Sequence, residues 1–183
     1  MMALYLETIP GGHGMEREKL DKLLAETIAQ ARAADVPVSP CIDPHVAVNP
    51  RAKTRFGCCR TRQRRHTIEL SAHTLQGGEQ AVRRVLAHEV LHTCPGCADH
   101  GPRWKQWAAV MNAQYGYELR RTDSFESLGL EDRRPVRYVA ECTRCGARIP
   151  RMKRSPLIEH PERYRCRCGG TFRILTPPFG ENT

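Results

Sequence analysis

His88-Glu89-Val90-Leu91-His92 is the stretch of sequence from which the fold and the chemistry can be worked out. In a helix, residues at i and i+4 lie one turn apart on the same side, so both histidines can reach one zinc ion. Glu89 lies between them, where a carboxylate can take a proton from water at the metal. The pattern therefore predicts a hydrolase. The alternative is a pair of solvated histidines on a helix surface.

The residues around this motif favour a helix with one packed face, followed by a sharp turn. At about 100° per residue, the apolar residues between 79 and 93 fall on one broad face, with the motif beside it. Pro95-Gly96 cannot continue a helix, and Asp99-His100-Gly101-Pro102 begins another. We therefore expect His100 to return toward His88 and His92 as a third zinc ligand. Three neutral histidines leave a tetrahedral zinc one open position for water, as in catalytic sites.

The chain upstream of the motif predicts one helix and short strands. Apolar residues recur at steps of three and four between residues 16 and 34, which indicates an amphipathic helix. Prolines at 37, 40, 44 and 50 then break the chain, with a short strand expected at 45–49. Residues 66–70 alternate as a strand does. The predicted fold class is therefore α+β, with the motif on an active-site helix.

The C-terminal part predicts a small β module, a zinc ribbon. Its first knuckle is Cys142-Thr143-Arg144-Cys145-Gly146, a tight turn that points two thiolates at a metal ion. The second, Cys166-Arg167-Cys168-Gly169, is one residue short, and Arg165 stands where a cysteine is usual. We expect Cys142, Cys145, Cys166 and Cys168 to bind a structural zinc ion. A degraded ribbon without metal is the alternative.

These patterns divide the chain into two domains. The catalytic domain is predicted over residues 1–130 and the ribbon over residues 135–178. Residues 121–134 are polar and have little periodicity, so a linker is expected there. The expected cofactor is zinc, one catalytic ion and one structural ion. Internal repeats are absent apart from the two knuckles.

The nine cysteines favour a reducing compartment. Residues 1–15 lack the basic and apolar regions of an export signal, and no apolar run is long enough to span a bilayer, so we expect a soluble cytoplasmic protein without membrane contact. Most cysteines fall in close pairs, which suits metal binding better than disulfides.

The cysteines outside the ribbon are open to more than one interpretation. For Cys94 and Cys97 the favoured interpretation is that they are small residues that fill a tight loop. A redox pair and a second metal site with Cys58 or Cys59 are the alternatives, while Cys41 is expected to be a buried thiol.

Positive charge is concentrated in two segments of a chain whose formal net charge is +9. Residues 51–65 hold seven Lys or Arg and no acid, and residues 133–173 hold twelve against three acids. Such surfaces favour the approach of nucleic acid, and Tyr138, Tyr164 and Phe172 could stack on unpaired bases. A solvated basic face is the alternative. The residues expected to contact DNA, single-stranded DNA included, are Arg51, Lys53, Arg55, Arg62, Arg64, Arg65, Arg151, Lys153 and Arg154.

The run H-E-V-L-H-T-C-P-G-C-A-D-H-G-P-R-W, residues 88–104, resembles the SprT-like zinc metallopeptidases, which are related to the eukaryotic protease Spartan. In that family a third zinc histidine follows in an H-G pair. The segment N-P-R-A-K-T-R-F-G-C-C, residues 49–59, resembles the family's R-W-G-x-C pattern, and the resemblance extends to about residue 172. It implies a small zincin-like metallopeptidase domain in which His88, His92 and His100 bind zinc and Glu89 is the general base. It also implies cleavage of proteins on DNA, notably DNA-protein crosslinks.

Three functions remain open at this point. The leading one is a zinc endopeptidase that its basic segments recruit to DNA, so that nearby proteins become substrates. The second is a nucleic-acid-binding module with a catalytically silent zinc ion, although a structural site has no need of Glu89. The third is a zinc peptidase whose basic surface binds an acidic protein partner. The natural substrate and the oligomeric state are left open.

Overall fold

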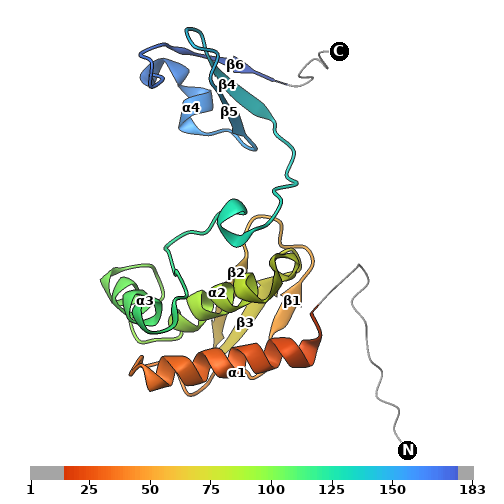
Figure 1. Cartoon of the computed structure of the whole chain (residues 1–183), viewed down its shortest axis with the longest axis vertical. Coiled ribbons are helices and arrows are strands. Elements are labelled where there is room, and N and C mark those ends of the chain that lie inside the picture. Colours follow the sequence, from red (N-terminus) through yellow and green to blue (C-terminus); the bar gives the residue numbers. More distant parts are fainter. Residues whose placement is uncertain (1–14, 177–183) are drawn as a thin grey trace, which may run out of the picture. The chain divides into compact units, whose positions relative to one another are not determined.

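The computed structural model describes residues 15–176, and these form two compact units that meet in sequence between Asp132 and Arg133 (Figure 1). The expected lack of an export signal concerns residues 1–15, of which residues 1–14 lie outside the described residues, as does the predicted ribbon end at residue 178. Among the helices in the described part, none is both long and apolar enough to cross a membrane.

A small mixed sheet forms one layer of the first unit. Within the described residues its order is β1-β3-β2, with β1 (Ala47–Asn49) parallel to β3 (Arg65–Ser71) and β2 (Gly57–Arg62) antiparallel to it. The alternation of β3 buries Ile68 and Leu70 against the helices. The turn between β2 and β3 places Gln63 and Arg64 at φ 48° and 66°, a left-handed conformation that this tight hairpin needs.

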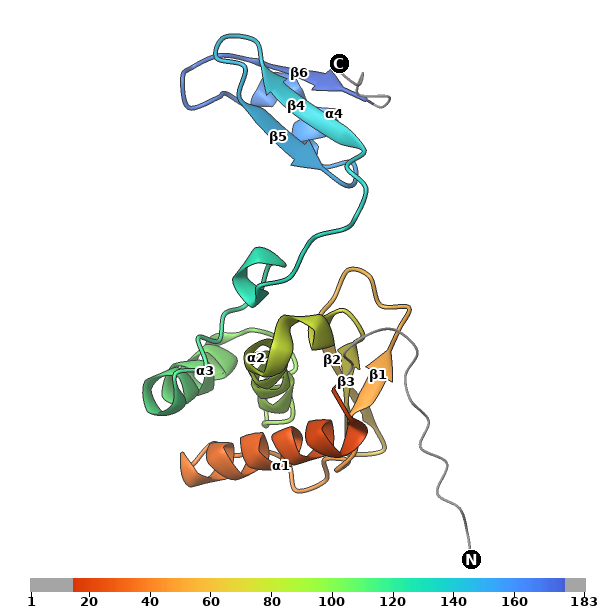
Figure 2. The ribbon, with the colours of Figure 1, turned by 45° about the vertical axis from the view of Figure 1, so that its right-hand side comes forward.

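Helices α1 (Arg17–Ala33), α2 (Gly78–Leu91) and α3 (Pro102–Tyr115) build the rest of the core. Helix α2 contacts α1, α3, β2 and β3, and Figures 1 and 2 both show α1 alongside α2. The apolar stripe predicted for the first helix is buried. The site motif therefore ends a helix that is held by packing on several sides.

The linker expected at about residues 121–134 differs from the structure over its first part. Leu128 and Leu130 are buried in the core of the first unit, and Phe125 packs against it. The Phe125 ring lies 4.9 Å from that of Phe56 in an edge-to-face contact. The apolar residues here follow neither a helix nor a strand period, so pattern reading alone gives no sign that they are buried.

Cys41 is exposed, so the expectation of a buried thiol was wrong. Its backbone carbonyl accepts a hydrogen bond from the His66 N–H at 2.9 Å, which ties the segment to β3 through the main chain. The side chain is left facing outward.

The second unit is a three-stranded antiparallel sheet in the order β5-β4-β6 within the described residues. Strand β4 (Tyr138–Cys142) lies between β5 (Arg148–Arg151) and β6 (Phe172–Leu175). A short helix, α4 (Pro156–Glu159), contacts β4. The predicted α+β class and the C-terminal zinc-ribbon architecture are confirmed.

Candidate active site and metal centres

His88, His92 and His100 converge at the junction of α2 and α3. One ring nitrogen of each lies within 4.8 Å of the others, and the Nε2 atoms of His88 and His100 are 2.8 Å apart. His88 belongs to the last turn of α2 and His92 caps that helix, whereas His100 lies two residues before the first residue of α3. The structure thus brings together the three histidines that the sequence singles out, in a group that could hold a metal ion.

The loop between the two helices orients His92 as well as reversing the chain. Nδ1 of His92 lies 2.7 Å from the carbonyl oxygen of Cys97, which can only accept a hydrogen bond. Nδ1 therefore carries the proton, and the lone pair of a neutral ring sits on Nε2, as a metal ligand requires. Gly96, at φ 73°, supplies the left-handed residue that the turn needs.

Trp104 packs against all three histidine rings. Its ring centroid lies 4.7 Å from that of His88, 5.9 Å from that of His92 and 4.8 Å from that of His100. The side chain is only 1% exposed, so it restricts the orientation of the imidazoles by packing. Sequence reasoning placed Trp104 on the second helix but gave it no part in the site. Its i+4 spacing from His100 was the available signal.

The environment keeps His88 and His100 in the form that binds metal. Burial, together with the neighbouring His92 and His100, lowers the pKa of His88 to about 3. Burial also lowers the pKa of His100. Neutral imidazoles are the ligand form for divalent metals, and the close approach of one nitrogen from each of the three rings suits a cation placed between them.

Glu89 is buried beside the histidines, at the contact between α2 and β2. Burial raises its pKa to about 7, against a backbone hydrogen bond from Cys59 and the charge of Arg55. A Cβ atom added at Gly57 would lie 2.9 Å from Cγ and Oε1 of Glu89 and 2.6 Å from Cγ1 of Val85. The strand can pass this close to the carboxylate only because residue 57 has no side chain. The role of that glycine was missed from the sequence.

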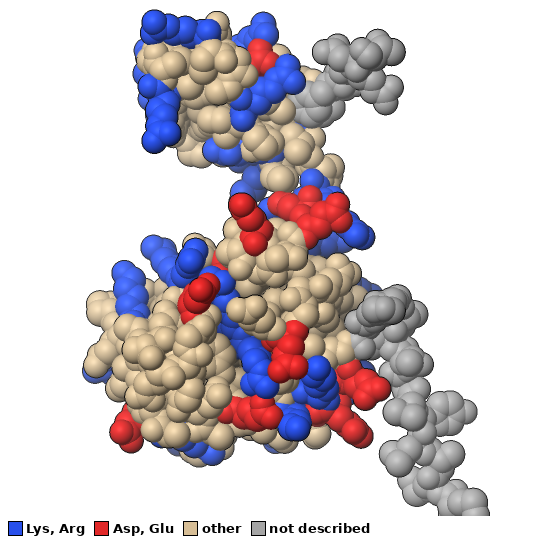
Figure 3. Space-filling view, in the orientation of Figure 1, with Lys and Arg blue, Asp and Glu red and all other residues tan. Residues whose placement is uncertain are grey.

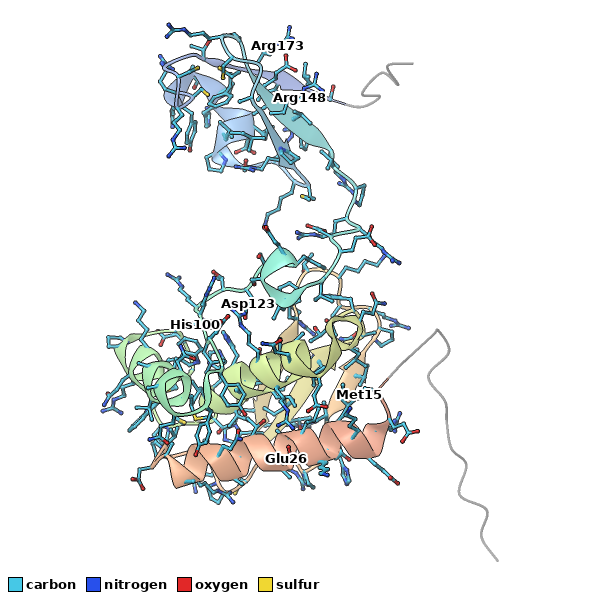
Figure 4. The ribbon with its side chains drawn as sticks, viewed as in Figure 1. Met15, Glu26, His100, Asp123, Arg148 and Arg173 are labelled. Atoms are coloured by element: carbon cyan, nitrogen blue, oxygen red, sulfur yellow. The ribbon has the colours of Figure 1, made fainter. Side chains whose placement is uncertain are left out.

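A nearly buried ion pair between Arg84 and Asp123 ties the segment after α3 to α2. Arg84, one turn before His88, lies 2.6 Å from Oδ1 of Asp123 and donates a hydrogen bond of 3.1 Å to the Ser127 carbonyl. The Arg84 and Asp123 side chains are 8% and 6% exposed. The same segment carries Arg120, whose backbone raises the pKa of His88, although burial outweighs this effect. Figure 4 shows Asp123 and His100 on the side of α2 opposite Glu26.

The four ribbon cysteines form the second group that could hold a metal ion. Their sulfur atoms lie within 4.8 Å of one another, with Sγ–Sγ distances of 3.5 Å for Cys142 and Cys168 and 3.6 Å for Cys145 and Cys166. Disulfide sulfurs are about 2.05 Å apart, whereas thiolates at about 2.3 Å from a tetrahedral zinc are separated by about 3.8 Å. The distances fit shared metal binding.

The shortened knuckle brings Cys166 into the group by a local backbone turn. The N–H of Gly169 donates to the carbonyl of Cys166, and the N–H of Cys166 donates to the carbonyl of Gly170, both at 2.8 Å. A Cβ atom at Gly170 would lie 2.7 Å from the sulfur of Cys142. Backbone N–H groups, that of Cys145 above all, lower the pKa of Cys142 to about 6, which favours a thiolate.

The remaining cysteines join neither group within the described residues. Cys94 and Cys97 are buried, and burial raises the pKa of Cys94 to about 12 and that of Cys97 as well. Such thiols are poor nucleophiles and poor ligands. The structure gives no support to a second metal site with Cys58 or Cys59, and the pair fills the turn that carries the carbonyl for His92.

The basic side chains expected to contact DNA lie at the surface, but two make ion pairs. Arg55 pairs with Glu69 at 2.5 Å and Arg65 with Asp43 at 3.4 Å. Arg151 is half-buried, while Lys153 and Arg154 are exposed. The others, Arg51, Lys53, Arg62 and Arg64, are exposed on or near the β2–β3 hairpin. In Figure 3 the visible face of the second unit carries many Lys and Arg side chains and few acids.

Comparison with known proteins gives a family match over more than half of the chain. The model of the SprT-like family matches residues 26–123, a span that contains all three histidines, Glu89, Gly57 and Asp123. No curated protein and no solved structure matches the chain.

Proposed function

The chain belongs to the SprT-like family, and on that premise we propose that it is a zinc-dependent endopeptidase whose substrates are other proteins. The observation that carries the proposal is the convergence of three histidines at the end of the helix that also carries the buried carboxylate of Glu89. The histidines alone would suit a structural ion. Glu89, buried next to them, supplies the proton acceptor that hydrolysis needs.

Each residue of the site has a distinct task in this proposal. His88, His92 and His100 would hold the zinc ion. Trp104 would keep all three rings oriented by packing, and the Cys97 carbonyl would orient that of His92. When bound, zinc would supply a Lewis acid that polarises a peptide carbonyl and makes water more acidic. Glu89 would accept the proton of the attacking water and return it to the leaving amine. Gly57 would let Glu89 sit at its position.

The ribbon supports a second part of the proposal, an association with DNA. We infer that Cys142, Cys145, Cys166 and Cys168 hold a structural zinc ion and that the basic residues around them bind phosphates, with Tyr164 exposed for stacking. The exposed arginines near the β2–β3 hairpin add positive charge to the first unit. DNA-bound or DNA-crosslinked proteins would then meet the peptidase at high effective concentration. Action in the cytoplasm belongs to this proposal, because reducing conditions keep the thiolates available.

The proposed activity is tested with wild-type protein and Glu89→Gln, which keeps the shape of the side chain but removes the base. With zinc present, we expect wild type to cleave casein or itself and Glu89→Gln to lose at least about 100-fold in rate. Both proteins should carry two zinc ions per chain. Undiminished cleavage by Glu89→Gln would remove the proposed base. Salt-dependent DNA binding without any cleavage would favour the non-catalytic binding module.

The association with DNA is tested by adding single-stranded and, separately, double-stranded DNA to the same assay. We expect DNA to stimulate cleavage of a DNA-binding protein substrate by wild type, and to stimulate nothing in Glu89→Gln. Cleavage that DNA leaves unchanged or inhibits would contradict recruitment to DNA. It would instead favour a peptidase whose basic surface binds an acidic protein.

A further inference from the structure

A cavity of about 520 Å³ opens beside His92, on the first unit. Its walls come from three places in the chain: residues 37–40 after α1, Thr61 and His66 at the base of the β2–β3 turn, and the loop that follows α2. A larger cavity of about 770 Å³ lies near α1 and residues 115–118, but the charged side chains that line it, Arg83 and Glu26 among them, pair with one another. The smaller cavity is the one that adjoins the metal ligands.

The lining of this cavity is uncharged, in contrast to a chain with a net charge of +9. Pro37, Val38, Pro40, Pro95 and Ala98 supply apolar surface, and none of the lining residues is Lys, Arg, Asp or Glu. Burial lowers the pKa of His66, so that its ring also faces the cavity without charge at neutral pH. A charged group placed here would lose hydration and find no partner, whereas an apolar group would be favoured.

The cavity adjoins the candidate active site at His92. This residue is part of the cavity lining and also belongs to the histidine group, and the loop between Thr93 and Ala98 forms part of the same wall. Consecutive residues of an extended polypeptide are about 3.5 Å apart, and their side chains point alternately to opposite sides. A peptide whose scissile bond lies at the histidines can therefore place a flanking side chain in this cavity.

We propose that the cavity is a specificity pocket, which takes an uncharged, apolar side chain of a residue next to the scissile bond. This inference rests on the proposed endopeptidase function and adds a substrate preference to it. The volume admits large aliphatic or aromatic side chains. The enzyme would thus cut at exposed apolar residues of its protein substrates, and its basic surfaces would have no part in choosing the bond.

The pocket is tested by substitutions of opposite charge at one exposed lining residue. We expect wild type to prefer an apolar over a charged flanking residue by about 10-fold or more in a peptide library read by mass spectrometry. Ala98→Lys should shift the preference toward Glu and Asp at that position, and Ala98→Asp should shift it toward Lys and Arg. Thr61→Lys changes a lining residue from another segment of the chain and should shift the preference in the same direction as Ala98→Lys. It tests the pocket even if Ala98→Lys and Ala98→Asp do not fold.

The matched control is Ala113→Lys, an exposed alanine on α3 that does not line the cavity. Its cleavage preference should equal that of wild type. If the Ala98 and Thr61 variants still cleave with the wild-type preference, the pocket is refuted while the proposed function stands. If wild type and Glu89→Gln are equally inactive on every peptide, the proposed function fails and the pocket fails with it.

Discussion

Gly57 has no side chain, and the position of the Glu89 carboxylate in the candidate site depends on this. We expect Gly57→Ala to push Glu89 away from its position, because the new Cβ would lie 2.9 Å from its Cγ and Oε1 atoms. A displacement of about 1 Å can lower a rate by about 100-fold, so kcat should fall by about this factor with little change in KM. Steady-state kinetics together with zinc analysis checks this.

The control for that change is Cys58→Ala, because neighbouring side chains of a strand point to opposite faces and Cys58 faces away from α2. Its kcat should stay near that of wild type. Wild-type kcat in Gly57→Ala would mean that Glu89 tolerates the methyl group, and the close approach of β2 would then be a packing detail.

Glu69 predicts a pH dependence of stability that is independent of the metal site. Burial raises the pKa of this carboxyl, but hydrogen bonds from Asn49 and Arg55 and the charge of Arg60 outweigh burial and leave the pKa below its ordinary value. A lowered pKa means that the stabilisation exists above the unfolded pKa, about 4.3, and is lost as the pH falls through the folded pKa.

We therefore expect Glu69→Gln to lower the free energy of unfolding by about 1 kcal/mol at pH 7, since both arginines are partly exposed and screened. The difference from wild type should shrink between about pH 5 and about pH 3. Urea denaturation with a chelator present, at both pH values, measures it. An equal difference at the two pH values would show that the ion pairs do not account for the stabilisation.

Among the elements, the shortened ribbon knuckle makes the sharpest prediction about metal binding. The backbone turn already brings the Sγ atom of Cys166 to 3.6 Å from the Sγ atom of Cys145. Arg165→Cys should therefore leave the metal content unchanged. Cys166→Ser should lose one zinc ion per chain while the histidine site stays loaded. Elemental analysis after dialysis distinguishes the two, with the exposed Cys41→Ser as control. Metal loss only in Arg165→Cys would mean that position 165 holds the ligand turn together.

Periodic elements could be predicted well from this sequence, and contacts between distant segments could not. The stripe on α1, the helix of the motif, the strand before it and the return of His100 all follow from local patterns. Phe125 and Leu128 carry no such pattern, because their burial depends on segments distant in sequence, such as those that bring the rings of Phe56 and His73 against Phe125. Trp104 and Gly57 were missed for the same reason. The four ribbon cysteines show that a knuckle one residue short can still bring its sulfur atoms together with those of the other knuckle.

For the whole molecule, the distribution of charge predicts how binding to DNA depends on salt. Lys153→Glu with Arg154→Glu should weaken binding of a labelled single strand and reduce the slope of log affinity against log salt by up to about 2. Cleavage of casein without DNA should be unchanged. The control pair is Lys22→Glu with Arg32→Glu, exposed on α1. Fluorescence anisotropy at several salt concentrations measures the slope. Equal slopes for wild type and the ribbon pair would exclude these residues as phosphate contacts.

The contact of one indole with three imidazoles gives the protein an optical reporter of its own. The chain has two tryptophans, Trp104 and Trp107. In a Trp107→Phe variant excited at the red edge of tryptophan absorption, nearly all fluorescence would therefore come from Trp104. Metal loading would fix the rings that surround this indole, and chelation would free them. Intensity and lifetime should therefore change on titration with zinc, which would let metal occupancy be followed in real time without a dye or a substrate.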